Sequence, residues 1–363
     1  MPTTHPRRSR IGALRSKVEE IAGLAATPLL PEDYIDLVSP LSSRTELRGR
    51  IMEILPETAD AATLTIKPGR TWKHHTAGQY IRIGVDIDGI RQWRAYSLTS
   101  PATRSDGCIT VTVKAMPDGF VSNHLVHRAE TGTIVQLDQA CGDFTLAEGL
   151  PDKTLFVTAG SGITPVMGMI RSHIDELDDV AVVHSAPTEA DIIFRDELRE
   201  LHAEGQISLI ERHTDLDGMI DTELLETLVP DLHERETWAC GPTGMLDDLE
   251  GHFAEAGLSH MIHTERFRPS VIVPGEGGEV TFSGCGTTVD ADGGRPILDV
   301  GEEAGVLMPS GCRMGICFGC VVPLREGAVR DLRSGDLTEA KLGDDVRIQT
   351  CVSAAAGPCN IDL

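Results

Sequence analysis

The spacing of four cysteines constrains this chain more than any other feature of its sequence. Cys312, Cys317 and Cys320 form the pattern C-x4-C-x2-C within PSGCRMGICFGC, and Cys351 follows on a later segment. Structural zinc sites typically use paired C-x2-C knuckles, whereas this longer spacing is one by which thiolates hold a [2Fe–2S] cluster. The four cysteines are therefore predicted ligands of an iron–sulfur cluster, with zinc as the alternative.

Three glycines are interleaved with these cysteines: Gly311, Gly315 and Gly319. Side chains at those positions would crowd the cluster's sulfides and hinder backbone N–H groups from pointing at them. Cys359 competes with Cys351 for the fourth ligand position, because it also lies near the C-terminus. Three further thiols are expected to be core or surface residues: Cys108, Cys141 and Cys285.

Composition and charge exclude several classes of partner. The 363 residues carry 32 basic and 56 acidic side chains, a formal net charge of −24, which disfavours nucleic acid or an anionic membrane as the main partner. No apolar run is long enough to cross a bilayer, and the basic N-terminus continues into a charged segment where a signal peptide needs an apolar one. We expect a cytoplasmic protein, not an integral membrane protein, without structural disulfides.

The hydrophobic period changes along the chain and predicts several domains. An amphipathic helix is expected in an N-terminal helical extension, 1–44. Apolar and polar residues alternate over 45–150, which predicts six short strands in a small antiparallel barrel or sandwich. Over 151–268, buried strands alternate with helices, which predicts an α/β domain with a parallel sheet. A linker at 269–277 and a small cysteine-bearing module at 278–363 follow.

The α/β domain contains a candidate nucleotide-binding turn in FVTAGSGITPVM. Gly160 and Gly162 separate a buried strand from a helix that Thr164 is expected to cap, with Pro165 in its first turn. Glycines let the backbone approach a phosphate, and the helix N-terminus offers free N–H groups to it. Because Pro165 stands where the commonest dinucleotide fingerprint has its third glycine, a plain tight turn explains this motif equally well.

Four motifs occur together in an order and spacing that resemble those of the ferredoxin–NADP reductase-like flavoproteins. They are RAYSLTS (94–100), GFVSNHL (119–125), AGSGITPV (159–166) and ACGPTGM (239–245). The C-terminal module resembles a plant-type β-grasp ferredoxin over nearly its whole length. The resemblance implies a multidomain fold of flavin barrel, α/β nucleotide domain and [2Fe–2S] domain. It also implies FAD, a [2Fe–2S] cluster and NADPH or NADH as cofactors.

The resemblance also assigns flavin contacts to the barrel. Arg94 would hold the flavin phosphate, with Ala95 beside it in the cofactor site. Tyr96 would lie against the isoalloxazine ring, and Ser97 would place its hydroxyl near flavin N5. From the strand pattern alone, Tyr96 is a core aromatic. Two later residues would cradle the FAD pyrophosphate: Val121 and Ser122.

In the same resemblance, the glycine turn with Thr164 and Pro165 approaches the nicotinamide dinucleotide. Cys240, Gly241 and Pro242 would border the nicotinamide. Without its place in the CGP motif, Cys240 would be interpreted as an inert buried thiol. Phe267 in HTERF is a candidate for covering the flavin ring, although this segment also fits an ordinary final strand.

The choice between NADPH and NADH depends on the end of the second buried strand, VAVVHSA. NAD-selective sites often present a carboxylate there, but this strand ends in His184 and Ser185 and no carboxylate follows until Glu189. The pattern favours NADPH, with Ser185 and Arg195 as phosphate contacts. The FRDEL segment around Arg195 also fits an ordinary helix start.

These expectations describe an NAD(P)H-dependent electron-transfer reductase that serves an external protein acceptor. The domain order resembles that of reductase components of bacterial oxygenases. QWRAYSLTS, the N-terminal helix and HTERF resemble actinobacterial reductases of membrane acyl-CoA desaturases, which implies a peripheral position at the membrane through the partner. Two alternatives stay open: a zinc-stabilised flavin or quinone reductase, and a non-catalytic iron–sulfur redox sensor.

Overall fold

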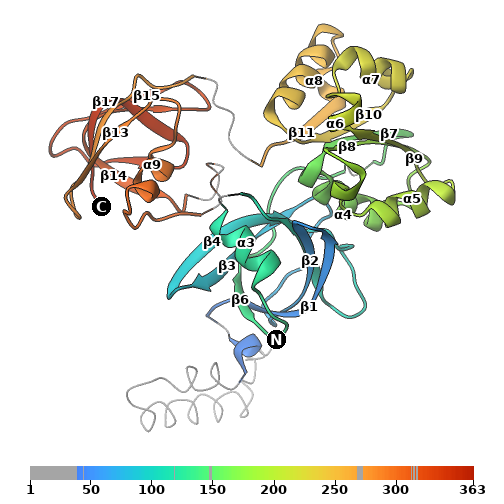
Figure 1. Ribbon diagram of the computed structural model, residues 1–363, viewed down its shortest axis with the longest axis horizontal. Coiled ribbons are helices and arrows are strands. Elements are labelled where there is room, and N and C mark those ends of the chain that lie inside the picture. Colours follow the sequence, from blue (N-terminus) through green and yellow to red (C-terminus); the bar gives the residue numbers. More distant parts are fainter. Residues whose placement is uncertain are drawn as a thin grey trace, which may run out of the picture.

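The computed structural model describes residues 39–43, 45–117, 119–146, 149–267, 273–311, 313, 315 and 318–363. These residues form three β-sheets; Figure 1 shows the first sheet below, with the other two on either side above it. The predicted N-terminal helix and two predicted cluster ligands, Cys312 and Cys317, lie outside the described residues. No helix within the described ranges is both long and apolar enough to cross a lipid bilayer.

The first sheet is antiparallel, with the strand order β4-β3-β6-β1-β2-β5. Its elements are β1 (Arg48–Thr58), β2 (Ala61–Pro68), β3 (Tyr80–Ile87), β4 (Ile90–Ser97), β5 (Ile109–Lys114), α3 (Phe120–His127) and β6 (Ile134–Leu137). Leu98, directly after β4, bridges Val111 in β5, so the two edge strands meet and the sheet closes. This barrel confirms the fold that the alternating pattern predicts.

The second sheet is parallel, with the order β11-β10-β7-β8-β9. Its strands are β7 (Lys153–Ala159), β8 (Asp179–Ala186), β9 (Ser208–His213), β10 (Glu236–Cys240) and β11 (Ile262–Glu265). The helices are α4 (Ile163–His173), α5 (Arg195–Ala203), α6 (Thr214–Asp217), α7 (Thr222–Leu228) and α8 (Thr243–Glu255), and four 3₁₀ turns are η2 (Gly160–Gly162), η3 (Glu189–Asp191), η4 (Leu232–Glu234) and η5 (Ser259–Met261).

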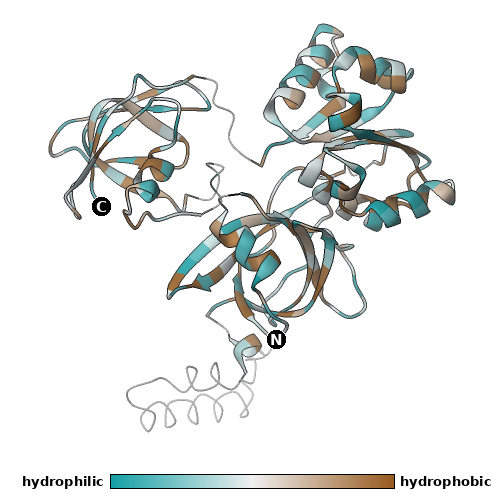
Figure 2. Cartoon of the chain, in the orientation of Figure 1, coloured by the Kyte–Doolittle hydropathy of each residue, from teal (hydrophilic) through white to brown (hydrophobic). Residues whose placement is uncertain are grey.

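Apolar cores lie on both faces of this parallel sheet. Phe156 of β7 packs with α4 and α5, whereas its neighbours Leu155 and Val157 pack with α7 and α8. Figure 2 shows α5 as largely hydrophilic, and Leu198 is its buried residue. Burial of both faces explains the continuous apolar strands, and the predicted parallel α/β fold is confirmed.

The third sheet is mixed, with the order β13-β12-β17-β14-β15 and with β16 also paired to β14. Its elements are β12 (Gly278–Phe282), β13 (Thr287–Ala291), α9 (Ile297–Glu303), β14 (Val321–Asp331), β15 (Leu337–Ala340), β16 (Val346–Gln349) and β17 (Ser353–Ile361). Ile297 and Leu298 of α9 pack into the core over this sheet. The arrangement is the β-grasp fold that the resemblance implies.

Candidate functional site

A cavity of about 1160 Å³ opens where the three sheets approach one another. Small-molecule sites commonly have volumes of roughly 300–1,000 Å³, so this cavity has room for more than one ligand. Its lining comes from β4 and the start of α3, from the carboxyl ends of β7, β8, β10 and β11, and from α9 and the cysteine-bearing loop. The ends of β7 and β10 lie where the parallel strand order reverses, which is where α/β sheets bind their ligands.

Strand β4 brings the four predicted flavin contacts to this cavity. Arg94, Ala95, Tyr96 and Ser97 all line it. Alternation along a strand would turn Ser97 away from Tyr96, but Ser97 is the last residue of β4, so its side chain is released from the pleat. Tyr96 also packs against the barrel core, so it serves packing and lines the cavity at once.

Burial sets the electrostatics of β4. Removal from water lowers the pKa of Arg94 to about 10, so its guanidinium stays charged at neutral pH. Its Nη1 donates to the carbonyl oxygen of Trp93 at 2.7 Å. Burial raises the pKa of Tyr96, so its hydroxyl stays neutral. The barrel wall therefore offers one fixed positive charge beside a neutral aromatic ring.

The start of α3 forms the second part of this wall. Val121 and Ser122 line the cavity in the first turn of the helix, where backbone N–H groups are free to bind an anion. The Ser122 hydroxyl accepts from the Met116 N–H at 3.1 Å and donates to the Gly119 carbonyl at 3.2 Å. A Cβ on Gly119 would lie 2.3 Å from that hydroxyl, so the turn depends on the glycine.

The glycine turn between β7 and α4 lines the opposite wall. Gly160 has a φ of +54°, which favours glycine, and a Cβ on Gly162 would lie 2.0 Å from the carbonyl oxygen of Cys240. The helix begins at Ile163, so the expectation that Thr164 caps it is wrong. The Thr164 hydroxyl donates instead to the Ser161 carbonyl at 2.9 Å, and Thr164 lines the cavity.

Two other predicted nucleotide contacts, Pro165 and Cys240, do not line the cavity. Pro165 is buried in α4, and Cys240 is fully buried at the end of β10; only the neighbours of Cys240 in the CGP motif, Gly241 and Pro242, reach the cavity. Burial raises the pKa of the Cys240 thiol well above its usual range. The contacts predicted for Pro165 and Cys240 stay predictions.

Glu265 is a cavity residue that the sequence reasoning missed. It pairs with Cys240 in the register of β11 against β10 and lines the cavity. Burial raises its pKa to about 8, and its Oε2 is buried without a hydrogen-bond partner among the described residues. The sequence signal for Glu265 is that it is the carboxylate of HTERF, the motif that contains the predicted site residue Phe267. Phe267 also lines the cavity, at 39% exposure.

Only one of the two predicted phosphate contacts reaches the cavity. Ser185 lines the cavity, whereas Arg195 begins α5, pairs with Asp196 at 3.1 Å and is not a lining residue. Arg212 in β9 pairs with Ser185 in the sheet register. Its Nη2 donates to the Asp217 carbonyl at 2.8 Å, and its Nε lies 4.0 Å from Asp217 Oδ2. Like Arg195, Arg212 is not a lining residue. Arg212 is therefore the cation placed beside Ser185 by the fold.

Two of the predicted cluster ligands lie within the described residues, and they converge. Cys320 and Cys351 are buried, and their Sγ atoms are 3.1 Å apart. Two side chains hold the carbonyl oxygen of Gly315 in the same loop: Arg333 Nη1 donates to it at 3.0 Å and Gln349 Nε2 at 2.9 Å. A pair of converging thiols beside a glycine loop fits an iron–sulfur cluster.

Cys359 differs from these two thiols. It lies within β17, where it pairs with Val280 of β12 and Gly327 of β14. Burial raises its pKa to about 11. Its place is that of a core residue in a regular strand.

The cluster loop reaches the flavin side of the cavity. Arg313 pairs with Asp299 at 3.0 Å and with Glu302, and all three line the cavity together with Cys351. The charge of Arg313 contributes to the lowered pKa of Arg94, whereas Glu302 and Asp299 oppose it. The side chains predicted to hold the flavin and the cluster therefore face one space.

Family models match three successive parts of the chain. They describe an oxidoreductase FAD-binding domain over 57–146, an oxidoreductase NAD-binding domain over 156–250 and a 2Fe-2S iron-sulfur cluster binding domain over 280–356. FAD, a nicotinamide dinucleotide and a [2Fe–2S] cluster are therefore the cofactors of this chain.

Similar proteins share nearly the whole length of the chain. An NADPH oxidoreductase of Mycobacterium tuberculosis is 49% identical over 353 residues, which cover 95% of this chain and 92% of the relative. A glycine betaine monooxygenase reductase subunit of Pseudomonas aeruginosa is 27% identical, with coverage of 90% and 99%. The solved structure of phthalate dioxygenase reductase has the same fold, with a TM-score of 0.60, 21% identity and coverage of 87% and 97%.

Proposed function

Because the chain belongs to the ferredoxin–NADP reductase-like flavoproteins with a C-terminal [2Fe–2S] domain, we propose that it carries electrons from NADPH to an oxygenase component or a membrane acyl-CoA desaturase. The chain is an NAD(P)H oxidoreductase, as its relatives and domains are. When bound, its cofactors supply two-electron transfer from the nicotinamide and one-electron transfer to the acceptor.

The observation that carries this proposal is the shared cavity. Tyr96 and Ser97 from the barrel, Gly162 from the α/β domain and Cys351 from the C-terminal domain all line it. Residues proposed to hold three different cofactors thus face one cavity. This arrangement makes a catalytic reductase a better interpretation than a redox sensor, which does not need a nucleotide site beside the flavin.

On the barrel side, we assign the binding of FAD to fixed groups. Arg94 binds the flavin phosphate as a partly buried cation, and the N–H groups at the start of α3 around Val121 and Ser122 bind the pyrophosphate. Tyr96, held by the barrel core, orients the flavin ring, and Ser97 donates a hydrogen bond to it.

On the nucleotide side, two uncharged side chains lie near the place assigned to the nicotinamide. At pH 7, Glu265 is mostly protonated because its pKa is about 8, and the Cys240 thiol behind it is also uncharged. An uncharged Glu265 does not repel the phosphates of the dinucleotide, and its free oxygen is available for a hydrogen bond to the nicotinamide.

We propose that Ser185 and Arg212 select NADPH by binding the 2′-phosphate. The support is their register pairing at the ends of β8 and β9, together with the lack of a carboxylate on the β8 side between His184 and Glu189. Arg212→Ala should lower kcat/KM for NADPH about 10- to 100-fold and leave NADH nearly unchanged, since a hydrogen bond to a charged group contributes about 1.5–3 kcal/mol. Arg195→Ala is the matched control; an equal loss in that variant would contradict the assignment.

The acceptor is the least constrained part of the proposal. The relatives named as oxygenase reductase subunits favour an oxygenase component, whereas QWRAYSLTS and HTERF favour a membrane acyl-CoA desaturase. The net charge of −24 favours a partner with a basic docking face. We propose a cytoplasmic protein that becomes peripheral at the membrane when its partner is a desaturase.

Anaerobic reduction with NADPH, followed by addition of each purified acceptor, tests this proposal. The true acceptor should reoxidise the flavin and the iron centre within the time of one turnover, and the other should not. The purified chain should contain about two irons. Zinc in place of iron would instead support the zinc-stabilised flavin or quinone reductase.

A further inference from the structure

Three side chains converge on the face of the parallel sheet that carries α7 and α8, away from the redox site. Glu226 belongs to α7, His233 to η4 and His252 to α8. Their ligand atoms all lie within 4.8 Å of one another, and none of the three side chains lines the interdomain cavity. None of these three residues has a role in the proposed electron transfer.

The distances fit a shared metal ion. The Nε2 atoms of His233 and His252 are 3.2 Å apart. A metal 2.0–2.1 Å from both nitrogens, as zinc requires, would subtend an N–metal–N angle of about 100°, close to tetrahedral. Glu226 Oε1 lies 3.2 Å from the Nε2 of His252 and 4.0 Å from that of His233. The distance of 4.0 Å to His233 is too long for two ligands of one ion, so the half-exposed Glu226 side chain must rotate to bring its carboxylate oxygen closer.

A hydrogen bond alone satisfies this cluster poorly. Each imidazole Nε2 has one bonding direction in the ring plane, either a lone pair or an N–H. His252 Nε2 faces both the other nitrogen and a carboxylate at the same distance of 3.2 Å, and it can bond well to only one of them. A cation between the three atoms bonds to all of them at once.

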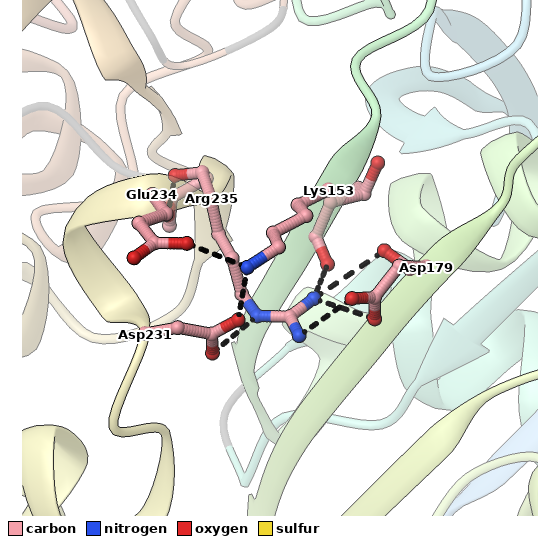
Figure 3. Close-up of polar contacts among 7 residues, drawn as sticks. Lys153, Asp179, Asp231, Glu234 and Arg235 are labelled. Carbon is pink, nitrogen blue, oxygen red and sulfur yellow. Dashed lines mark hydrogen bonds and ion pairs between the residues drawn. The ribbon is translucent and has the colours of Figure 1, made fainter.

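Ion pairs on both sides hold His233 in this position (Figure 3). Lys153 binds Asp231, which directly precedes η4, at 3.0 Å, and Glu234, the last residue of η4, at 2.6 Å. Arg235, directly after η4, binds Asp231 at 2.8 Å and Asp179 at 2.9 Å. The turn is thus tied to the first residues of β7 and β8, so His233 is oriented before any ligand arrives.

Packing in the apolar core holds α8, the helix that carries His252, in place. Phe253, next to His252 on α8, is fully buried. Its ring lies edge-on to His233, with the ring centroids 6.1 Å apart, and the two imidazole rings are stacked at 5.2 Å. The histidines are therefore preorganised by packing as well as by ion pairs.

We propose that Glu226, His233 and His252 form a binding site for a divalent transition-metal ion of the zinc type. Two imidazoles and one carboxylate are a ligand set that suits such an ion, and water would take the fourth position. The ion would tie α7, η4 and α8 together on one face of the α/β domain.

Titration of the full-length protein, loaded with flavin and cluster, with ZnCl₂ in a calorimeter tests the site. The wild type should bind one more Zn²⁺ than His252→Ala, or bind it about 100-fold or more tightly. Glu226→Gln should weaken binding by a smaller factor. His260→Ala, an exposed histidine on η5 outside the cluster, is the matched control and should bind as the wild type does. Equal zinc binding by wild type and His252→Ala would overturn the proposal.

Two readouts separate this site from adventitious binding by thiols. Zinc-edge X-ray absorption of the protein loaded with one Zn²⁺ should show only nitrogen or oxygen at about 2.0–2.1 Å; sulfur at about 2.3 Å would contradict the assignment. Zn²⁺ should raise the thermal midpoint of the wild type and of His260→Ala but not that of His252→Ala. All variants should keep NADPH-driven activity without zinc, which shows that they are folded.

Discussion

The two walls of the interdomain cavity differ in how they are built to bind. The barrel wall uses charged and aromatic side chains beside the free N–H groups of α3: Arg94 is a partly buried cation and Tyr96 a ring held by the core. The α/β wall uses backbone and neutral groups, with Gly160 and Gly162 in a tight turn and Glu265 kept protonated by burial. This difference suits a resident flavin on one side and a nucleotide that must leave after each turnover on the other.

The largest effect is expected from Gly162→Ala on the α/β wall. The new Cβ would lie 2.0 Å from the Cys240 carbonyl oxygen, so α4 must move away from β10, which should cost about 3 kcal/mol of unfolding free energy and abolish NADPH binding. Chemical denaturation and NADPH titration measure both.

Gly251→Ala is the control for that variant. Gly251 lies inside α8, and no atom lies within 4 Å of an added Cβ, so this change should stabilise the protein by about 0.5–1 kcal/mol. If Gly162→Ala were as stable as the wild type and bound NADPH normally, the close approach of α4 to β10 would not matter for the α/β wall.

A smaller, selective effect is expected from Arg94→Ala on the barrel wall. Loss of a charged contact to a phosphate should weaken FAD binding by about 10- to 100-fold, or about 1.5–3 kcal/mol, without changing the affinity for NADPH. Release of FAD, followed by its fluorescence, measures the change. Arg50→Ala, an exposed arginine on β1, should keep its FAD; an equal loss there would show that the effect is not specific to the barrel wall.

The smallest effect is a pH dependence from Glu265. Its folded pKa of about 8 lies above its ordinary value of 4.5, so the folded protein holds the proton more tightly than the unfolded chain. Stability should fall as the pH rises from about 4.5 to about 8, and Glu265→Gln should remove this decline.

The rate of flavin reduction by NADPH provides a second test of Glu265. It should drop above pH 8 in the wild type, because the ionised carboxylate then faces the nucleotide, and it should stay flat in Glu265→Gln. Parallel profiles in the two proteins would show that Glu265 is not the titrating group.

Fold and site differ in how far the sequence alone predicts them. The strands β1 to β6 alternate because each is buried on one face, and the strands of the parallel sheet are continuously apolar because each is buried on both faces. The hydrophobic period alone therefore predicts both kinds of strand. The spacing of Cys320 and Cys351 predicts their meeting, because the fourth thiol of such a site must come from a later strand.

The missed residues depend on strand order, which no local pattern encodes. Glu265 reaches the cavity because β11 is the neighbour of β10, and Arg212 lies beside Ser185 because β9 is the neighbour of β8. Thr164 was expected to cap α4, but the 3₁₀ turn η2 runs directly into the helix and leaves no separate cap position. Long-range strand pairing therefore places Glu265 and Arg212, and the tight turn sets the start of α4. Local sequence propensity predicts neither.

Electron paramagnetic resonance of the NADPH-reduced protein, prepared without oxygen, tests most directly that both walls serve one electron path to the cluster. The wild type and Cys359→Ser should show the signal of a reduced [2Fe–2S] cluster, whereas Cys351→Ser should reduce its flavin but lack that signal. A wild type whose flavin is reduced while its cluster stays oxidised would contradict the path from nucleotide to cluster. Loss of the signal in Cys359→Ser with its retention in Cys351→Ser would contradict the ligand assignment.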